Sequence, residues 1–241
     1  MSAPMPADLA RFAEVEHWVF DLDNTLYPAH TRLFDQIDRR IGEYVSRLLG
    51  VEAEEAHRIQ KDYYRRHGTT LSGLMSEHGI TPDDFLDYVH DIDHSPVERD
   101  PRLGAAIAAL PGHCYIFTNG SRRHAEKVIE RLGVTRPFAG IFDIVAADLK
   151  PKPGPEPYAR FIAEHAIAPE RAAMFEDLSR NLKEPKRLGM ATTLIVPRGT
   201  REVFREDWEL EGRDAAHIDF VTDHLADFLT GIVTFLAAGT R

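Results

Sequence analysis

Cysteine is almost absent from this sequence, whose 241 residues include only Cys114. A single cysteine cannot form an intramolecular disulfide, so the fold must depend on a hydrophobic core, which the 43% of hydrophobic residues can supply. Cys114 lies in the apolar run CYIF (114–117), where we expect a buried and unreactive thiol. This cysteine usage fits a reducing cytosol.

Long apolar runs and an excess of basic residues are also lacking. No stretch approaches the length of a membrane span. Residues 1–14 lack a basic region followed by an apolar core, so we expect no signal peptide and a cytoplasmic protein. The 39 acidic residues outnumber the 29 basic ones, which gives a net charge of −10 and argues against a broad grip on nucleic acid. A small phosphorylated substrate needs only a local positive pocket, and we expect a monomer or homodimer.

Short apolar runs predict the strands of a parallel sheet. Most are continuous rather than alternating, as expected when both faces of a strand are covered. Helical patterns lie between them, and this alternation implies an α/β fold with right-handed crossovers. The predicted strands are residues 17–20, 114–119, 141–147, 172–177 and 191–196, with a weaker run at 217–221.

Helices are predicted between the strands from periodicity and from end signals. The helix after the second strand has Ser121 as a suitable N-cap and Gly133 as a suitable C-cap. Pro185 lies inside another helical pattern and predicts a kink or a late helix start there. The remaining patterns cover residues 154–167, 178–189 and 222–236.

The alternation is interrupted between residues 29 and 100. Apolar residues recur at helical spacing from Leu33 to Leu48, with polar residues between them. Further helical patterns cover residues 53–67, 71–79 and 81–92, and the block has no convincing strand. We therefore predict a Rossmann-like catalytic core formed by residues 1–28 and 101–241, with an inserted α-helical cap subdomain at residues 29–100.

Polar side chains follow four of the predicted strands. Because the carboxyl ends of parallel strands meet at one edge of a sheet, these side chains should lie together. Each also has a structural explanation: aspartates cap turns, a Thr-Asn-Gly turn is common, lysines in a proline-rich connector are solvated, and acidic pairs complement helix dipoles. The conjunction of all four favours a functional site. The residues are Asp21 and Asp23, Thr118 and Asn119, Lys150 and Lys152, and Glu176 and Asp177.

These residue types suit phosphoryl transfer to a carboxylate. One carboxylate can attack phosphorus and form an aspartyl-phosphate, while a second gives a proton to the leaving group and later takes one from water. Asp21 and Asp23 point to the same side of an extended chain. Several carboxylates would repel a phosphate, so a hard cation such as Mg²⁺ is required, with Asp21 and Asp177 as ligands. Thr118, the amides near Asn119 and a lysine would hold the phosphoryl oxygens.

Four motifs, in this order, resemble those of the haloacid dehalogenase-like hydrolase superfamily. FDLDNTLYP resembles its Asp-x-Asp-x-Thr motif, and IFTNG resembles the hydrophobic run that ends in Thr or Ser. KPGPEPY resembles the lysine motif, and FEDLSRN resembles the paired acidic motif. The resemblance spans roughly residues 15–200. It implies a Rossmann-like core, and the long helical insert resembles a C1-type cap that closes over the site.

The resemblance implies catalytic and metal-binding roles. Asp21 would be the nucleophile and Asp23 the general acid/base, which would also offer its backbone carbonyl to Mg²⁺. Asp177 would ligate Mg²⁺, while Glu176 would act in the outer metal shell.

The resemblance also implies a phosphate site. Thr118 and Lys152 would bind the phosphate, together with the backbone amides around Asn119. Lys150 also begins a Lys-Pro-x-Pro pattern, but Lys152 is favoured because its motif continues into a helix with Tyr158 at the expected place.

The second aspartate of the first motif separates branches of the superfamily. Dehalogenases attack carbon and have no leaving alkoxide to protonate, so Asp23 favours a phosphatase or phosphomutase. The stretches DLDNTLYP, RRHGTTLSGLMSEHGI and FTNGSRRHAEKVIERLGV resemble bacterial relatives of pyrimidine 5′-nucleotidases. This resemblance implies hydrolysis of UMP or CMP to nucleoside and phosphate. The alternatives are a phosphatase for a sugar phosphate or phosphoglycolate, and a non-catalytic ligand-binding or scaffold protein.

Residues at the predicted helix ends of the insert are candidates for reading the substrate. Tyr63 and Tyr64 could stack on a base, although aromatic residues at helical spacing more often belong to a core. Histidines on such helices are commonly just exposed. The candidates at the helix ends are His67, Thr69, Thr70, His90 and Asp93.

Overall fold

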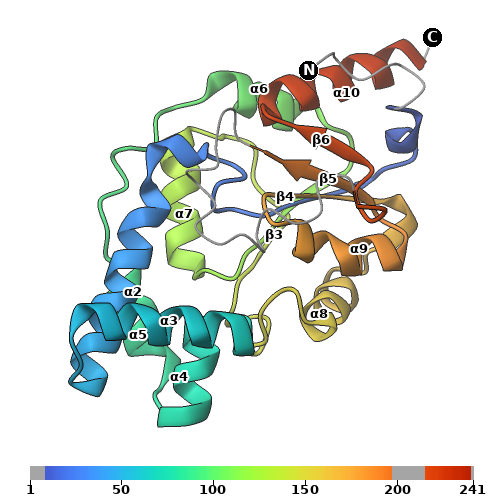
Figure 1. Ribbon diagram of the computed structural model, residues 1–241. Helices are drawn as coiled ribbons and strands as arrows, with labels where there is room; N and C mark the ends of the chain where they lie inside the picture. The colour runs from blue at the N-terminus through green and yellow to red at the C-terminus, as the bar shows by residue number, and fades with distance from the viewer. Residues whose placement is uncertain (1–8, 197–214, 240–241) are drawn as a thin grey trace.

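Six parallel strands form one sheet in the computed structural model, which describes residues 9–196 and 215–239 (Figure 1). The spatial order is β3-β2-β1-β4-β5-β6. The first eight residues, and residues 197–214 and 240–241 of the predicted core, lie outside the described ranges. The strands are β1 (His17–Phe20), β2 (His113–Phe117), β3 (Gly140–Phe142), β4 (Ala172–Glu176), β5 (Ala191–Ile195) and β6 (Phe220–Thr222).

Helices cover both faces of this sheet, which explains the continuous apolar runs (Figure 1). Successive side chains of a strand point to opposite faces. Trp18 and Phe20 pack in one buried cluster with α6 (Pro101–Ala109), α7 (Arg122–Leu132) and α10 (Leu225–Gly239). Val19 packs in a second cluster with α8 (Pro155–His165) and α9 (Lys183–Leu188). The α/β class predicted from the sequence is confirmed.

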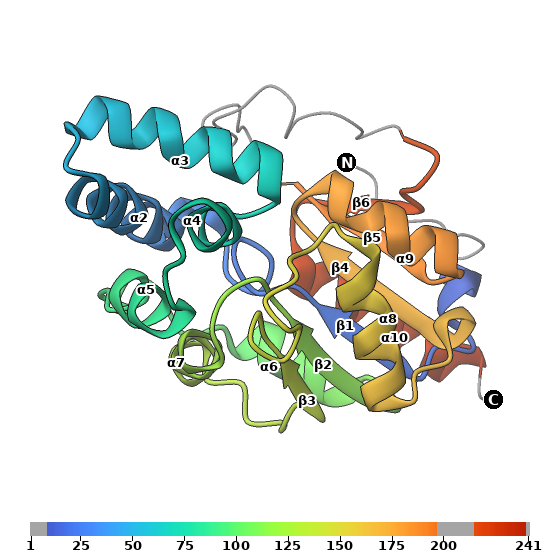
Figure 2. The ribbon, with the colours of Figure 1, turned by 90° about the horizontal axis from the view of Figure 1, so that it is seen from below.

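Four helices lie between β1 and β2 in the chain: α2 (Leu33–Leu49), α3 (Ala53–His67), α4 (Thr70–His78) and α5 (Pro82–Val89). We call them the helical insert. Within residues 29–100, all of which are described, the chain forms no strand. The insert has a buried cluster of its own, to which Ile144 from the segment after β3 also contributes. Figures 1 and 2 both place these helices together at one end of the sheet, away from α10.

Local end signals set several of these bounds. The Ser121 side chain caps α7, and Gly133 ends it with φ +71°. Pro185 lies in the first turn of α9, where it needs no intrahelical partner, and a 3₁₀ turn (Ser179–Leu182) precedes that helix. The late helix start predicted from Pro185 is therefore confirmed.

Two local predictions differ from the structure. The apolar run 141–147 was expected to be one strand, but β3 ends at Phe142 because Asp143 turns the chain. Its Oδ1 accepts from the backbone N–H of Ala146 at 2.9 Å, and its Oδ2 accepts from that of Arg122 at 2.8 Å. Helix α6 was not predicted, although Asp100 caps it through the Leu103 N–H at 2.9 Å.

Membrane-spanning helices do not occur in the described ranges, since no helix there combines the length and the apolar composition required.

Candidate active site

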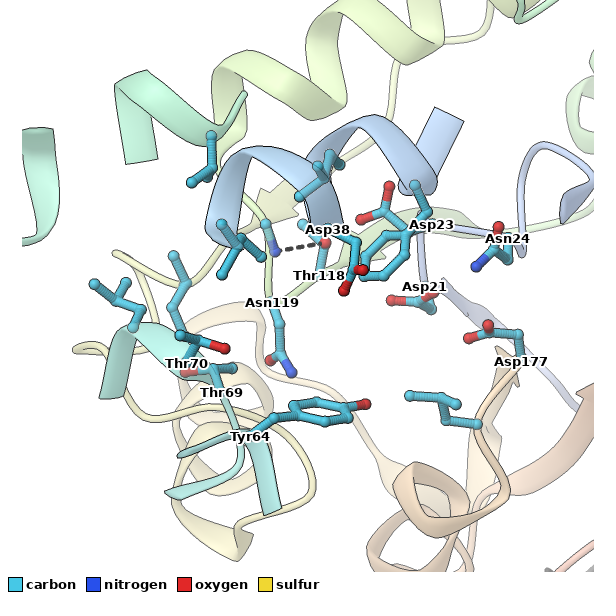
Figure 3. Close-up of a pocket in the computed structure, with 18 of the residues that line it drawn as sticks. Asp21, Asp23, Asn24, Asp38, Tyr64, Thr69, Thr70, Thr118, Asn119 and Asp177 are labelled. Carbon is cyan, nitrogen blue, oxygen red and sulfur yellow. Dashed lines mark hydrogen bonds between the residues drawn. The ribbon is translucent and has the colours of Figure 1, made fainter. Parts of the chain in front are cut away.

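A cavity of about 770 Å³ separates the helical insert from the carboxyl ends of the strands (Figure 3). Parallel sheets present their ligand crevice at this edge. The sheet side carries the predicted polar residues Asp21, Asp23, Thr118, Asn119, Lys152, Glu176 and Asp177. The insert side carries Ile37, Asp38, Gln60, Lys61, Tyr64, Thr69, Thr70, Leu86 and His90, among others.

Asp21 follows β1 and is held by two donors. The Lys152 ammonium donates to its Oδ1 at 2.8 Å, and the Thr25 hydroxyl donates to its Oδ2 at 3.1 Å. The turn after Asp23 passes through Asn24 at φ +59°, a conformation that asparagine tolerates better than most residues. Burial, with Glu176 as a neighbour, raises the pKa of Asp21 to about 7 despite Lys152.

Lys152 lies at the centre of the buried charges. Its side chain is 1% exposed, and its ammonium group also donates to Glu176 Oε1 at 2.7 Å and to the Phe117 carbonyl at 2.8 Å. Burial would lower the pKa of Lys152, but the two carboxylates outweigh this and raise it. Lys150, the competing lysine of the sequence, is exposed. The geometry thus brings Lys152, rather than Lys150, into contact with Asp21.

Three carboxylates could hold a metal ion. Asp21, Glu176 and Asp177 each offer an oxygen within 4.8 Å of the others, and all three are buried. An all-oxygen set suits a hard cation such as Mg²⁺. Burial and the neighbouring Glu176 and Asp21 raise the pKa of Asp177 well above its usual value, so a cation would favour the charged form. These residues fit Mg²⁺.

Glu176 is already engaged on both oxygens. Besides Lys152, its Oε1 accepts from Asn181 Nδ2 at 2.6 Å, and its Oε2 accepts from the Leu178 N–H at 2.8 Å. These bonds fix the orientation of the Glu176 side chain. The outer-shell role expected for Glu176 from the sequence stays a prediction.

Thr118 and Asn119 follow β2 and differ in what their side chains do. The Thr118 hydroxyl faces the cavity and accepts from the Gly120 N–H at 2.9 Å (Figure 3). The Asn119 amide instead braces the backbone of Lys152: its Oδ1 accepts from the Lys152 N–H at 2.9 Å, and its Nδ2 donates to the Lys152 carbonyl at 3.1 Å. The side chain of Asn119 thereby fixes the lysine loop.

Asp23 is held separately from Asp21. Its Oδ1 accepts from the Tyr27 hydroxyl at 2.6 Å and lies 2.9 Å from His124 Nε2. Burial alone would raise the pKa of Asp23, but the contacts with His124 and Tyr27 outweigh it and hold the pKa below its usual value. Neighbouring aspartates with different partners can take different roles.

The predicted substrate-reading residues are distributed unevenly. Thr69 and Thr70 line the cavity, but their hydroxyls serve the fold: Thr69 caps α4 through the Ser72 N–H, and Thr70 donates to the Gln60 carbonyl at 3.2 Å. His67 is turned to the surface network of Arg66 and Glu77 and is not among the described residues that line the cavity. The histidine is therefore placed away from the expected position.

The insert side of the cavity carries polar residues that the sequence did not single out, among them Asp38, Gln60 and Lys61. Asp38 is buried, and its Oδ1 accepts from Gln60 Nε2 at 2.8 Å and from Lys61 Nζ at 3.0 Å. Tyr64 lies across the cavity from Asp21 and Thr118, as Figure 3 shows. Tyr63 and Tyr64 were both candidates for stacking on a base, and Tyr64 is the one that lines the cavity. Nothing local in the sequence indicated which side of α3 faced the site.

Sequence comparison assigns the family. The family profile described as haloacid dehalogenase-like hydrolase matches residues 15–189, which is more than half of the chain. The chain belongs to the haloacid dehalogenase-like hydrolase family. This hydrolase is also similar in sequence to a curated protein, Phosphate metabolism protein 8 of Saccharomyces cerevisiae, to which it is 30% identical over 134 residues. The matched stretch covers 51% of this chain and 41% of the yeast protein, so the chain spans less than half the length of that relative.

Solved structures of other haloacid dehalogenase-like proteins share the fold at low identity. CbbY from Rhodobacter sphaeroides, in complex with phosphate, has a TM-score of 0.59 and 19% identity, with 88% of this chain and 96% of that chain covered. A HAD phosphatase from Thermococcus onnurineus has a TM-score of 0.58 and 16% identity, with 90% and 98% covered. L-2-haloacid dehalogenase from Xanthobacter autotrophicus has a TM-score of 0.54 and 18% identity, with 94% and 100% covered.

Proposed function

We propose that this hydrolase is a Mg²⁺-dependent phosphomonoesterase that acts on nucleoside monophosphates, with UMP and CMP as the first candidates. The observation that carries the proposal is the pair of aspartates in one cavity with separate partners. Lys152 and Thr25 hold Asp21, whereas Tyr27 and His124 hold Asp23. A dehalogenase would have no use for the second group, because a departing halide takes no proton.

The proposed reaction has two steps. In the first, an Asp21 carboxylate oxygen attacks phosphorus and the bond to the leaving oxygen breaks. The negative charge of the bound phosphate ester would raise the pKa of Asp23 above its low value in the free site, so that Asp23 can carry a proton and give it to the departing alkoxide. In the second, a water molecule loses a proton to Asp23 and attacks the aspartyl-phosphate, which releases phosphate and restores Asp21. The net reaction consumes one water molecule per ester.

The remaining sheet residues hold charge in place. Lys152 and the Thr118 hydroxyl would bind phosphoryl oxygens, and Asn119 keeps the Lys152 loop in register through its paired hydrogen bonds. Asp21, Asp177 and the backbone carbonyl of Asp23 would hold Mg²⁺, which when bound neutralises the negative charge that carboxylates and phosphate bring together. The four helices of the insert would act as a cap that excludes water and selects the leaving group.

The size and lining of the cavity support a nucleotide as substrate. Its volume of about 770 Å³ falls in the range of sites for small organic ligands. The Asp38–Lys61–Gln60 group offers hydrogen-bonding partners for sugar hydroxyls or base edges, and Tyr64 offers a ring against which a base can pack. A sugar phosphate remains the second candidate.

A panel of phosphate esters assayed with Mg²⁺ tests this proposal. UMP and CMP should give the highest kcat/KM, and Tyr64→Ala should lower it for nucleotides more than for glucose 6-phosphate. A wide margin in favour of sugar phosphates would overturn the nucleotide assignment. Equal and negligible turnover by the wild-type protein and Asp21→Asn would instead favour a non-catalytic ligand-binding or scaffold protein.

A further inference from the structure

Three buried histidines from different segments form a chain of contacts that ends at Asp23. His124 lies in the first turn of α7 and is fully buried, whereas His90 ends α5 and His94 lies in the segment that returns from the insert to the core. Each of the latter two is 8% exposed. None of the three takes part in the two chemical steps proposed above.

The hydrogen bond between His94 and His124 has a defined direction. His94 Nδ1 lies 3.1 Å from the Ile92 carbonyl, which can only accept, so this nitrogen carries the proton. Burial, with His124 as a neighbour, lowers the pKa of His94 to about 4, so its Nε2 is an acceptor near neutral pH. His124 Nδ1 donates to that Nε2 at 3.0 Å. The other ring nitrogen of His124 is thereby aimed at Asp23 Oδ1.

A second contact fixes the plane of the His124 ring. The His90 ring stacks on it with centroids 4.8 Å apart and planes 17° apart. His90 is itself held, since its Nδ1 lies 3.0 Å from the Leu86 carbonyl and 3.1 Å from the Ser121 hydroxyl. The His124 ring therefore cannot turn about its side-chain bonds without breaking its contact with His90.

We propose that His124 is a positioning residue that holds the Asp23 carboxylate in its acid/base orientation, and that His90 and His94 make this orientation depend on how the helical insert is seated. The inference rests on the proposed function for its catalytic consequence. Asp23 has one other side-chain partner in the described chain, Tyr27, which comes from its own loop and not from the insert. Of these two partners of Asp23, His124 is the one that contacts side chains of the segment His90–His94.

The reaction offers a readout that a purely structural role would not change. Loss of acid catalysis slows esters with poor leaving groups, such as UMP, far more than p-nitrophenyl phosphate, whose leaving group needs little protonation. We expect His124→Leu to lower kcat/KM for UMP by about 100-fold, the lower end of general acid–base contributions, and for p-nitrophenyl phosphate less than about fivefold. KM should change little. His124→Gln, whose side-chain amide can donate or accept a hydrogen bond at the place of Nε2, should recover part of the loss.

Two further variants complete the test. His94→Leu removes the acceptor that aligns His124 and should reproduce the leaving-group dependence at about tenfold, a partial loss of the acid–base contribution. His165→Leu is the matched control, because His165 lies on α8 against Phe161, on the other face of the sheet. It should lower both activities equally or not at all. Equal losses for both esters in His124→Leu, in a protein that unfolds at the wild-type temperature, would overturn the proposal.

A measurement without turnover separates this inference from the proposed function. In ¹⁵N-histidine-labelled protein, the buried His124 imidazole should give a downfield N–H resonance. Asp23→Asn should shift that resonance and His94→Leu should abolish its Nδ1 component, whether or not any ester is hydrolysed. An inactive wild-type protein with these spectra would refute the proposed function alone. Spectra insensitive to both substitutions would refute the positioning role.

Discussion

Replacement of Lys152 by methionine is the perturbation for which the structure gives the firmest magnitude. Methionine keeps much of the side-chain volume but removes the ammonium group, which donates to Asp21, Glu176 and the Phe117 carbonyl at 2.7–2.8 Å. The carboxylates would then lie buried without their cation. Breaking a buried ion pair from one side typically costs about 3–5 kcal/mol.

This cost corresponds to a large change in thermal stability. In a chain of this size each kcal/mol lowers the unfolding temperature by about 2–4 °C, so we expect a decrease of about 6–20 °C in metal-free buffer. Mg²⁺ should recover part of the loss, because a ligand that binds only the folded state stabilises it by mass action. Hydrolysis of UMP should be lost even where the protein is folded.

Circular dichroism melts with and without EDTA check this expectation. Lys150→Met is the matched control, since Lys150 is exposed two residues away and its loss should change stability by less than about 0.5 kcal/mol. A decrease of under 2 °C for Lys152→Met, or equal decreases for both variants, would refute the reasoning that Lys152 neutralises the buried carboxylates; a shift of that size is below what about 1 kcal/mol produces.

Three other predictions follow from described residues. The pKa of Asp21 is raised to about 7, so the folded protein binds the Asp21 proton more tightly than the unfolded chain does, and the stability that this group contributes falls as pH rises from about 4 to 7. In EDTA, the melting temperature of Asp21→Asn minus that of wild type should therefore be larger at pH 8 than at pH 5. The same difference at both pH values would contradict this expectation. Gly73→Ala should cost about 1–3 kcal/mol in chemical denaturation, because a Cβ there would lie 2.5 Å from Tyr63 Cβ, whereas Gly231→Ala, which meets open space in α10, should gain up to about 1 kcal/mol. Burial raises the pKa of Cys114 to about 11, so at pH 8 roughly one thousandth of the thiol is ionised. A maleimide should therefore label Cys114 only when the protein unfolds. Rapid labelling of the native protein would show that the thiol is not buried.

Features set by local signals were predictable from the sequence. The predicted span 53–67 coincides with α3, and α7 begins after Ser121 and ends before Gly133 as its caps require. The sheet followed from the continuous apolar runs, and the strand-end rule correctly brought Asp21 and Lys152 to the same cavity although 131 residues separate them.

Features set by contacts between distant segments were not predictable. The Asp143 side chain, which ends β3, accepts a hydrogen bond from the backbone N–H of Arg122 in α7. The hydrophobicity of residues 141–147 could not reveal this contact or the turn that goes with it. The side chains of Asp23 and His124 are 101 residues apart in the chain. A signal for His124 did exist, because it shares the buried face of α7 with Ala125 and Val128. That pattern indicates a buried histidine but does not name its partner.

The insert packs mainly around its own buried cluster, and this has a consequence for how such a protein can diversify. Under the proposed function, substitutions on the cavity wall of α2 and α3, such as at Asp38, would change which leaving group is accepted, while the hydrogen bond between Asp21 and Lys152 stays as it is. The segment from His90 to His94 does not have this freedom, since its side chains contact His124. Selection for a new substrate and selection for the chemistry would therefore act on different stretches of the same insert.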